Sequence, residues 1–177
     1  MFRRKTAKQP IVRKVLSAEE IAVLPRAGLP RRMAALLYDM FLVIAIWFCF
    51  GFLLLGVFGL FADNTSTLVD GQVQTHPVLS FLMFLMMVST SVAFYLWFWN
   101  HNGQTVGMIA WRIRALRTDN GSIGPREGMI RLLLAWPSFW CLGLGYLYMY
   151  ANPERDALHE KLSGTKTVLL PRHARPF

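Results

Sequence analysis

Two long apolar runs without a charged residue constrain this chain more than any other feature. Residues 40–62 and residues 77–100 contain no Lys, Arg, Asp or Glu. At about 1.5 Å per residue, a helix over the first run reaches roughly 35 Å, enough to cross a hydrocarbon core of about 30 Å. Charged residues make up only 16% of the chain, against about 25% in a soluble domain. The sequence therefore predicts an all-α membrane protein with two transmembrane helices.

A third apolar run, residues 132–151, is interrupted by Pro137, Gly143 and Gly145. Proline removes a helical hydrogen bond and clashes with the preceding turn. We expect a broken, re-entrant membrane segment here. A single kinked crossing is the alternative.

Basic residues precede the first run and recur in residues 101–128 and after residue 152, whereas residues 63–76 have none and carry Asp63 and Asp70. The positive-inside rule places the N-terminus and the middle segment in the cytoplasm and the acidic loop outside. The basic tail also favours the cytoplasm, which is why the re-entrant form is preferred for the third run.

Residues 111–115 alternate apolar and basic side chains, which is typical of a strand on a surface. Residues 165–170 are a second strand candidate. An open strand edge cannot face lipid, so residues 109–116 are expected to pair with residues 165–170 in a small sheet at the cytoplasmic interface. Residues 119–121 read as a tight turn, and Pro125 is placed to open the next helix.

The most informative polar residues stand at the start of the first apolar helix. Arg32 and Asp39 are seven apart, so they share a helix face about 10 Å apart along the axis, with Ala35 between them. A carboxylate in a membrane helix normally faces the protein interior and has a partner. Asp39 is therefore either an ion- or proton-binding group or a buried tie, bonded to Arg32 or to the cytoplasmic segment.

Three segments carry a family resemblance. They are R-R-x-x-A-x-x-x-D ending at Asp39, G-Q-T-V-G at residues 103–107, and L-H-E-K-L-S-G-T at residues 158–165. In this order they resemble the RDD family of bacterial membrane proteins, named for one Arg and two Asp. The family Arg corresponds to Arg32, the first Asp to Asp39, and the second to Glu160, a longer acid. Met108 stands where many members have a basic residue, and Arg112 where many have glycine.

The resemblance implies a multi-pass protein of the bacterial inner membrane, and the positive-inside rule gives it a cytoplasmic N-terminus. Residues 1–28 form a basic cytoplasmic segment, residues 29–170 the membrane domain, and residues 171–177 a short basic tail. Arg32, Asp39 and Glu160 are expected to form a polar cluster near the cytoplasmic face.

Other chemistry is sparse. Cys49 and Cys141 lie in apolar runs, where packing is a simpler role than redox pairing. His76, His101, His159 and His173 have no metal-ligand spacing, and we expect no metal, no cofactor and no enzymatic site. Arg112, Arg114 and Arg117 beside membrane spans favour anionic lipid headgroups over nucleic acid.

Two functions remain open at this stage. The first is a non-enzymatic accessory, assembly or lipid-interacting protein, working with membrane lipids and with other membrane proteins or copies of itself. The second is a small-ion or solute transporter, for which the resemblance suggests Na⁺/H⁺ exchange, acting as an oligomer because so few spans cannot enclose a pathway.

Overall fold

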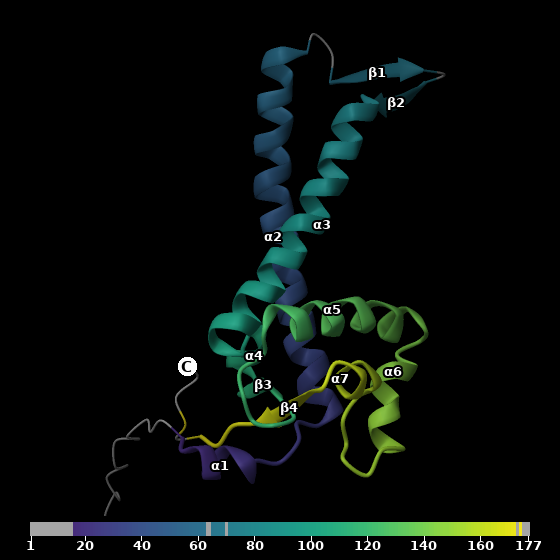
Figure 1. The fold of residues 1–177 in the computed structure, drawn as a ribbon. Helices are drawn as coiled ribbons and strands as arrows, with labels where there is room; N and C mark the ends of the chain where they lie inside the picture. Colours follow the sequence, from purple (N-terminus) through teal and green to yellow (C-terminus); the bar gives the residue numbers. More distant parts are fainter. Residues whose placement is uncertain (1–15, 63–64, 70, 173, 175–177) are drawn as a thin grey trace, which may run out of the picture.

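The computed structural model describes residues 16–62, 65–69, 71–172 and 174. The predictions for the basic residues before position 16, for Asp63 and Asp70, and for His173 and most of the tail concern positions outside these residues. In the described part, two long helices project from a head domain that contains most of the other elements (Figure 1).

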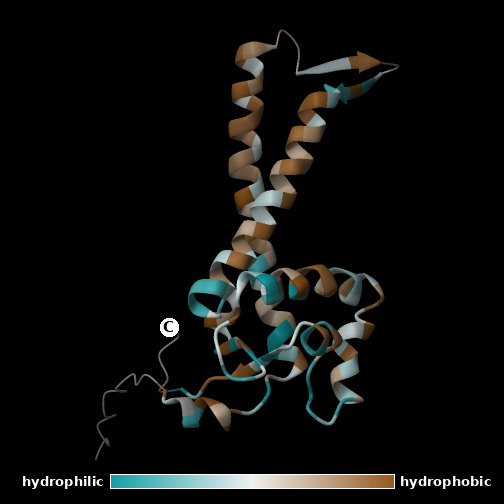
Figure 2. Ribbon diagram, viewed as in Figure 1, coloured by the Kyte–Doolittle hydropathy of each residue, from teal (hydrophilic) through white to brown (hydrophobic). Residues whose placement is uncertain are grey.

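The projecting helices are α2 (Leu29–Phe61) and α3 (Pro77–Asn102). Both are long and apolar enough to cross a membrane. Helix α2 has 33 residues and therefore reaches about 50 Å, so its first turns lie inside the head domain and only the rest projects. The hydrophobic colouring dominates the projecting parts of both helices (Figure 2).

One polar contact joins the two helices within their apolar parts. The Trp47 indole N–H donates to the Met87 carbonyl and to the Ser91 hydroxyl, both at 3.1 Å. Beyond this contact the helices diverge toward a hairpin of β1 (Ser66–Val69) and β2 (Gln72–Thr75). The sequence analysis did not predict this hairpin.

The predicted sheet forms, with a shorter first strand. Strand β3 (Ile113–Arg117) pairs antiparallel with β4 (Thr165–Leu169). The prediction that pairing begins at residue 109 is wrong, because α4 (Val106–Ala110) occupies that segment and Arg112 turns the chain with φ of 54°. The turn at residues 119–121 forms as expected, with Asn120 at φ of 69°.

The segment before α2 also joins this sheet. Ser17 caps α1 (Ala18–Ala22), and Arg26 then bridges to Val168 in antiparallel sense. The Ala27 amide donates to the Thr167 carbonyl at 2.9 Å. Segments before α2, after α4 and after α7 therefore meet at one sheet.

The third apolar run is a bent pair of helices. Helix α5 (Pro125–Trp140) opens at Pro125, as predicted, and continues through Pro137. The break falls later, at Leu142 and Gly143, both with positive φ. The chain then turns by 107° into α6 (Leu144–Leu147) and the 3₁₀ turn η1 (Tyr148–Tyr150). Helix α5 runs transverse to α2 and α3, at their base (Figure 1).

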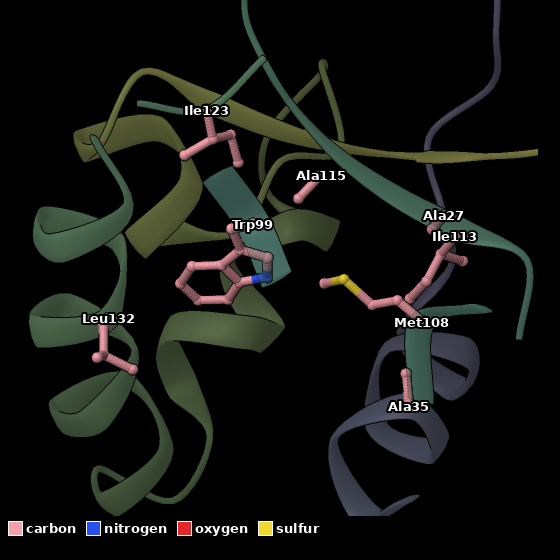
Figure 3. Close-up of a cluster of buried hydrophobic side chains, with 8 residues drawn as sticks. All are labelled: Ala27, Ala35, Trp99, Met108, Ile113, Ala115, Ile123 and Leu132. Atoms are coloured by element: carbon pink, nitrogen blue, oxygen red, sulfur yellow. The ribbon is translucent and has the colours of Figure 1, made fainter. Parts of the chain in front are cut away.

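The apolar core lies in the head domain, where α3, α4, β3 and α5 meet the base of α2 (Figure 3). Trp99 contributes its largest side chain, and the other members are Ala27, Ala35, Met108, Ile113, Ala115, Ile123 and Leu132. The packing role expected for Cys49 and Cys141 is wrong, because both cysteines are free and exposed. Both lie in apolar segments, on faces that no other part of the described chain covers.

Candidate functional site

A buried ion network surrounds Glu160, which lies on α7 (Leu158–Leu162). One carboxylate oxygen, Oε2, accepts from the Arg32 guanidinium and from the Ala157 amide. The other, Oε1, accepts from Arg131 and from the Thr167 hydroxyl. A carboxylate offers about four lone-pair positions, so this carboxylate is fully used by the chain itself.

Arg131 is the member of this network that the sequence analysis missed. Its guanidinium donates to the Thr165 hydroxyl at 2.8 Å, to the Thr167 hydroxyl at 2.9 Å and to Glu160 at 3.1 Å. It also lies over the Trp99 ring, 5.1 Å from the centroid. The sequence offered no clear signal for this role, because a basic residue just before an apolar run is also what the positive-inside rule predicts.

The network is almost fully shielded from solvent. Arg32, Arg131 and Glu160 are 6%, 4% and 0% exposed. Burial alone would raise the pKa of Glu160, but the two guanidinium groups and the Thr167 hydroxyl outweigh burial and hold that pKa below its ordinary value. Glu160 is therefore a permanent anion near neutral pH, matched by two cations.

Arg32 extends the network to the chain preceding α2. Its Nε donates to the Ala27 carbonyl at 2.8 Å, and its Nη2 donates to the Arg155 carbonyl at 3.4 Å. Nearby, Arg26 forms a second ion pair with Asp156, at 2.7 Å. These contacts fasten the start of α2 to the segment before α7.

Asp39 forms a separate contact, with the segment that follows α3. Its Oδ2 accepts from the Thr105 hydroxyl, and its Oδ1 accepts from the Gly107 amide at 2.7 Å. Thr105 is also the N-cap of α4, accepting from the Met108 amide. A side chain of α2 thus completes the N-terminus of α4 and joins the two helices.

The glycines of the G-Q-T-V-G segment are explained by this joint. A Cβ at Gly107 would overlap the Ala35 carbonyl, so α4 approaches α2 only with glycine there. Gly103 ends α3 in the left-handed region, with φ of 65°, and a Cβ on it would lie 2.7 Å from the Ala115 carbonyl. Gln104 between them is fully buried and donates to the Ile113 carbonyl.

The three expected cluster residues therefore fall into two sets. Arg32 and Glu160 are in direct contact, whereas Asp39 bonds to the segment after α3. The expectation of one cluster needs this correction because seven residues separate Arg32 and Asp39 by about 10 Å along the helix. Of the two partners considered for Asp39, the segment between the second and third apolar runs is the one that it contacts.

Arg112, Arg114 and Arg117 are all half-buried but differ in their partners. Arg117 pairs with Asp119. Arg114 stacks over Gly103, and its Nε is shielded without a hydrogen-bond partner. Arg31 joins this region by donating to the Trp111 carbonyl at 3.4 Å. Within the described residues, Arg31, Arg112 and Arg114 form no ion pair with a carboxylate.

His159, the neighbour of Glu160, is a buried neutral group. It is 3% exposed, and its ring lies against Tyr146 with centroids 4.7 Å apart. Burial and the Arg131 charge lower the pKa of His159 to about 3. No group of three or more His, Cys, Asp or Glu side chains that could hold a metal is found among the residues with a described position.

Two helices that are long and apolar enough to span a bilayer, with a head domain at their base, point to a membrane protein. The sequence model of the RDD family matches residues 26–164, most of the chain, and the chain belongs to that family. Comparison with curated proteins and with solved structures gives no match.

Proposed function

We propose that this protein is a non-enzymatic accessory protein of the bacterial inner membrane. Helices α2 and α3 anchor it, and the head domain lies at the cytoplasmic surface, where it binds anionic lipid headgroups. Its partners are lipids together with other membrane proteins or copies of itself. The N-terminus is cytoplasmic, in keeping with the basic residues on the head-domain side.

One observation carries this proposal: the buried carboxylates are used by the chain's own donors. Glu160 accepts four hydrogen bonds and Asp39 accepts two. A group that must bind and release an ion or a proton needs a free coordination position in one of its states. The fully bonded carboxylate of Glu160, and Asp39 with one donor on each oxygen, instead support a role in holding the head domain on its anchor.

The lipid partner is supported by three arginines at the base of the spans, Arg31, Arg112 and Arg114. A guanidinium group binds phosphate through two parallel N–H donors. These three side chains have donors to spare, because within the described residues they donate a single hydrogen bond, from Arg31 to a backbone carbonyl. Arg117 differs, because its Nε and Nη2 already donate to the Asp119 carboxylate.

The test is the thermal stability of detergent-solubilised protein with added phosphatidylglycerol or phosphatidylcholine. We expect phosphatidylglycerol to raise the melting temperature of the natural protein more than phosphatidylcholine does. A triple variant, Arg31→Gln, Arg112→Gly and Arg114→Gln, should lose that difference. The matched control Arg117→Gln should keep it.

Arg112→Gly alone separates folding from binding. Glycine favours the left-handed backbone that Arg112 adopts, so this variant should keep its melting temperature in phosphatidylcholine while responding less to phosphatidylglycerol. An undiminished phosphatidylglycerol response in the folded triple variant would overturn the proposed lipid site.

A small-ion or solute transporter, such as a Na⁺/H⁺ exchanger, is the second candidate. It is favoured by one observation, a carboxylate 2% exposed on a membrane helix, at Asp39. Such a function would need several copies of the chain, because two spans enclose no pathway. Sodium-driven proton movement across the membrane of sealed vesicles would separate the two candidates.

A further inference from the structure

Helix α5 carries an apolar face that no part of the described chain covers. Its buried side, formed by Gly128, Arg131, Leu132 and Ser138, packs against α3, α6 and α7. Its other side exposes four large apolar residues at spacings of four, three and four, which keeps them on one helix face. They are Met129, Leu133, Trp136 and Trp140, the last 72% exposed.

The exposed face continues past the bend. Leu142, Leu144 and Leu147 are 91%, 62% and 45% exposed, and residues 132–151 contain no charged side chain. Soluble surfaces rarely expose so large an apolar patch. The middle of α5 is coloured hydrophobic (Figure 2), and α5 packs against α3, a helix long enough to span the bilayer.

The β3–β4 sheet constrains the side of the membrane on which the segment of α5 and α6 begins and ends. Strands β3 and β4 are hydrogen-bonded to each other, and α5 and α6 lie in the chain between them. Both ends of the intervening segment are therefore on the same side of any membrane, and one net crossing between them is incompatible with the sheet. Helix α5 also lies transverse to the two long helices (Figure 1).

We propose that α5 and the bend that follows it lie in the plane of the membrane surface, with the face of Met129, Leu133, Trp136 and Trp140 immersed in lipid. The occupant of this face is the acyl-chain and headgroup boundary of the bilayer. Tryptophan favours that depth, and an amphipathic helix buries its apolar face roughly 5–10 Å into it. The third segment then neither crosses nor re-enters.

The inference does not depend on the proposed headgroup site, and it is tested by depth measurements on the full chain in vesicles. Single spin labels are attached to cysteine variants in a Cys49→Ser, Cys141→Ser background. Depth follows from the ratio of oxygen to nickel-chelate collision rates. The labelled variants are Met129→Cys, Leu133→Cys, Trp136→Cys and Trp140→Cys.

We expect all four α5 labels at nearly the same shallow depth. A segment that enters the membrane along its axis would instead show a change of about 16 Å between positions 129 and 140. The control positions lie on α3 and are all exposed, namely Phe81, Phe84 and Val88. They should show a gradient of about 10 Å.

Three outcomes overturn the inference. A depth gradient along α5 means that the segment enters the bilayer. Full access to the nickel chelate means that the face lies in water. Shielding from both reagents means that protein, not lipid, covers it. Because the labelled positions are exposed, none of the substitutions disturbs a buried contact.

Discussion

At the scale of single residues, the molecule depends on one buried anion that touches four donors. Removing a partner from a buried, hydrogen-bonded ion pair costs about 3–5 kcal/mol, because the remaining charge is left uncompensated. Glu160 is fully buried between Arg32 and Arg131. Its charge therefore matters more to folding than that of an exposed acid.

Glu160→Gln should lower the free energy of unfolding by about 3–5 kcal/mol. The matched control is Asp119→Asn, which removes an exposed acid paired with Arg117 and should cost about 0–1 kcal/mol. Unfolding in detergent, followed by helical circular dichroism, measures both. Equal losses in the two variants would contradict the buried network.

Burial of neutral His159 should make the folded protein lose stability at a higher pH than the one at which its carboxylates become protonated. The pKa of His159 is lowered from 6.5 to about 3 in the folded protein, so the unfolded chain binds more protons between these values. Stability is therefore complete above pH 6.5 and falls as the pH drops, by up to about 1.4 kcal/mol per pH unit. His159→Gln should remove this loss between pH 6.5 and 5, as measured by melting temperature.

The lowered pKa of Glu160 affects stability in a different, more acidic pH range. Its stabilising effect is present above the unfolded value of 4.5 and is lost as the pH falls below it. A pH profile in which His159→Gln still loses stability between pH 6.5 and 5 would show that another group titrates there.

Residue-scale prediction succeeded where the signal was local. Arg32 and Glu160 stand in short motifs that the family resemblance singled out, and the structure places them in direct contact. Arg131 was missed because its role depends on α5 folding back over α7 and Trp99, which no spacing in the sequence reveals.

At the scale of elements, the base of α2 is joined to α4 through two members of a stripe of buried residues, Ala35 and Asp39. Arg32, Ala35, Asp39 and Val43 are the buried positions of α2, spaced by three and four. Gly107 lets α4 approach this stripe, since a Cβ there would meet the Ala35 carbonyl and the Asp39 carboxylate. The motif glycine and the motif aspartate thus form one joint.

Gly107→Ala should destabilise the protein by about 1–3 kcal/mol, the usual cost of overpacking. Gly56→Ala is the matched control, because Gly56 is in the interior of α2 and a Cβ placed there would have no described atom within 4 Å. The control should be neutral or slightly stabilising. Thermal melts in detergent that rank the two variants equally would contradict the close approach.

Element boundaries were predictable where the sequence has strong stop and start signals. Pro125 opens α5, and the long apolar runs lie within α2 and α3. Residues 109–112 were wrongly assigned to a strand because the alternation of 111–115 was extended backwards into a segment capped by Thr105. The β1–β2 hairpin was missed because its residues are exposed and lack a core face.

At the scale of the whole molecule, one small sheet gathers segments from three parts of the chain. Strand β4 is hydrogen-bonded both to β3 and to residues 25–27. The two long helices lie in the chain between residues 25–27 and β3. This arrangement fits an anchor that crosses the membrane twice and carries a head domain on one side. The two-span prediction and the pairing of distant strands both follow from apolar length and from the need to satisfy strand edges.

We infer that Asp39 and Glu160 hold the head domain on its anchor and do not move ions. The most direct test places purified protein in sealed vesicles containing a pH-sensitive dye and imposes a sodium gradient. We expect no sodium-driven pH change beyond that of empty vesicles, with the protein shown to be folded by circular dichroism. A sodium-driven pH change that disappears in folded Asp39→Asn would contradict this inference.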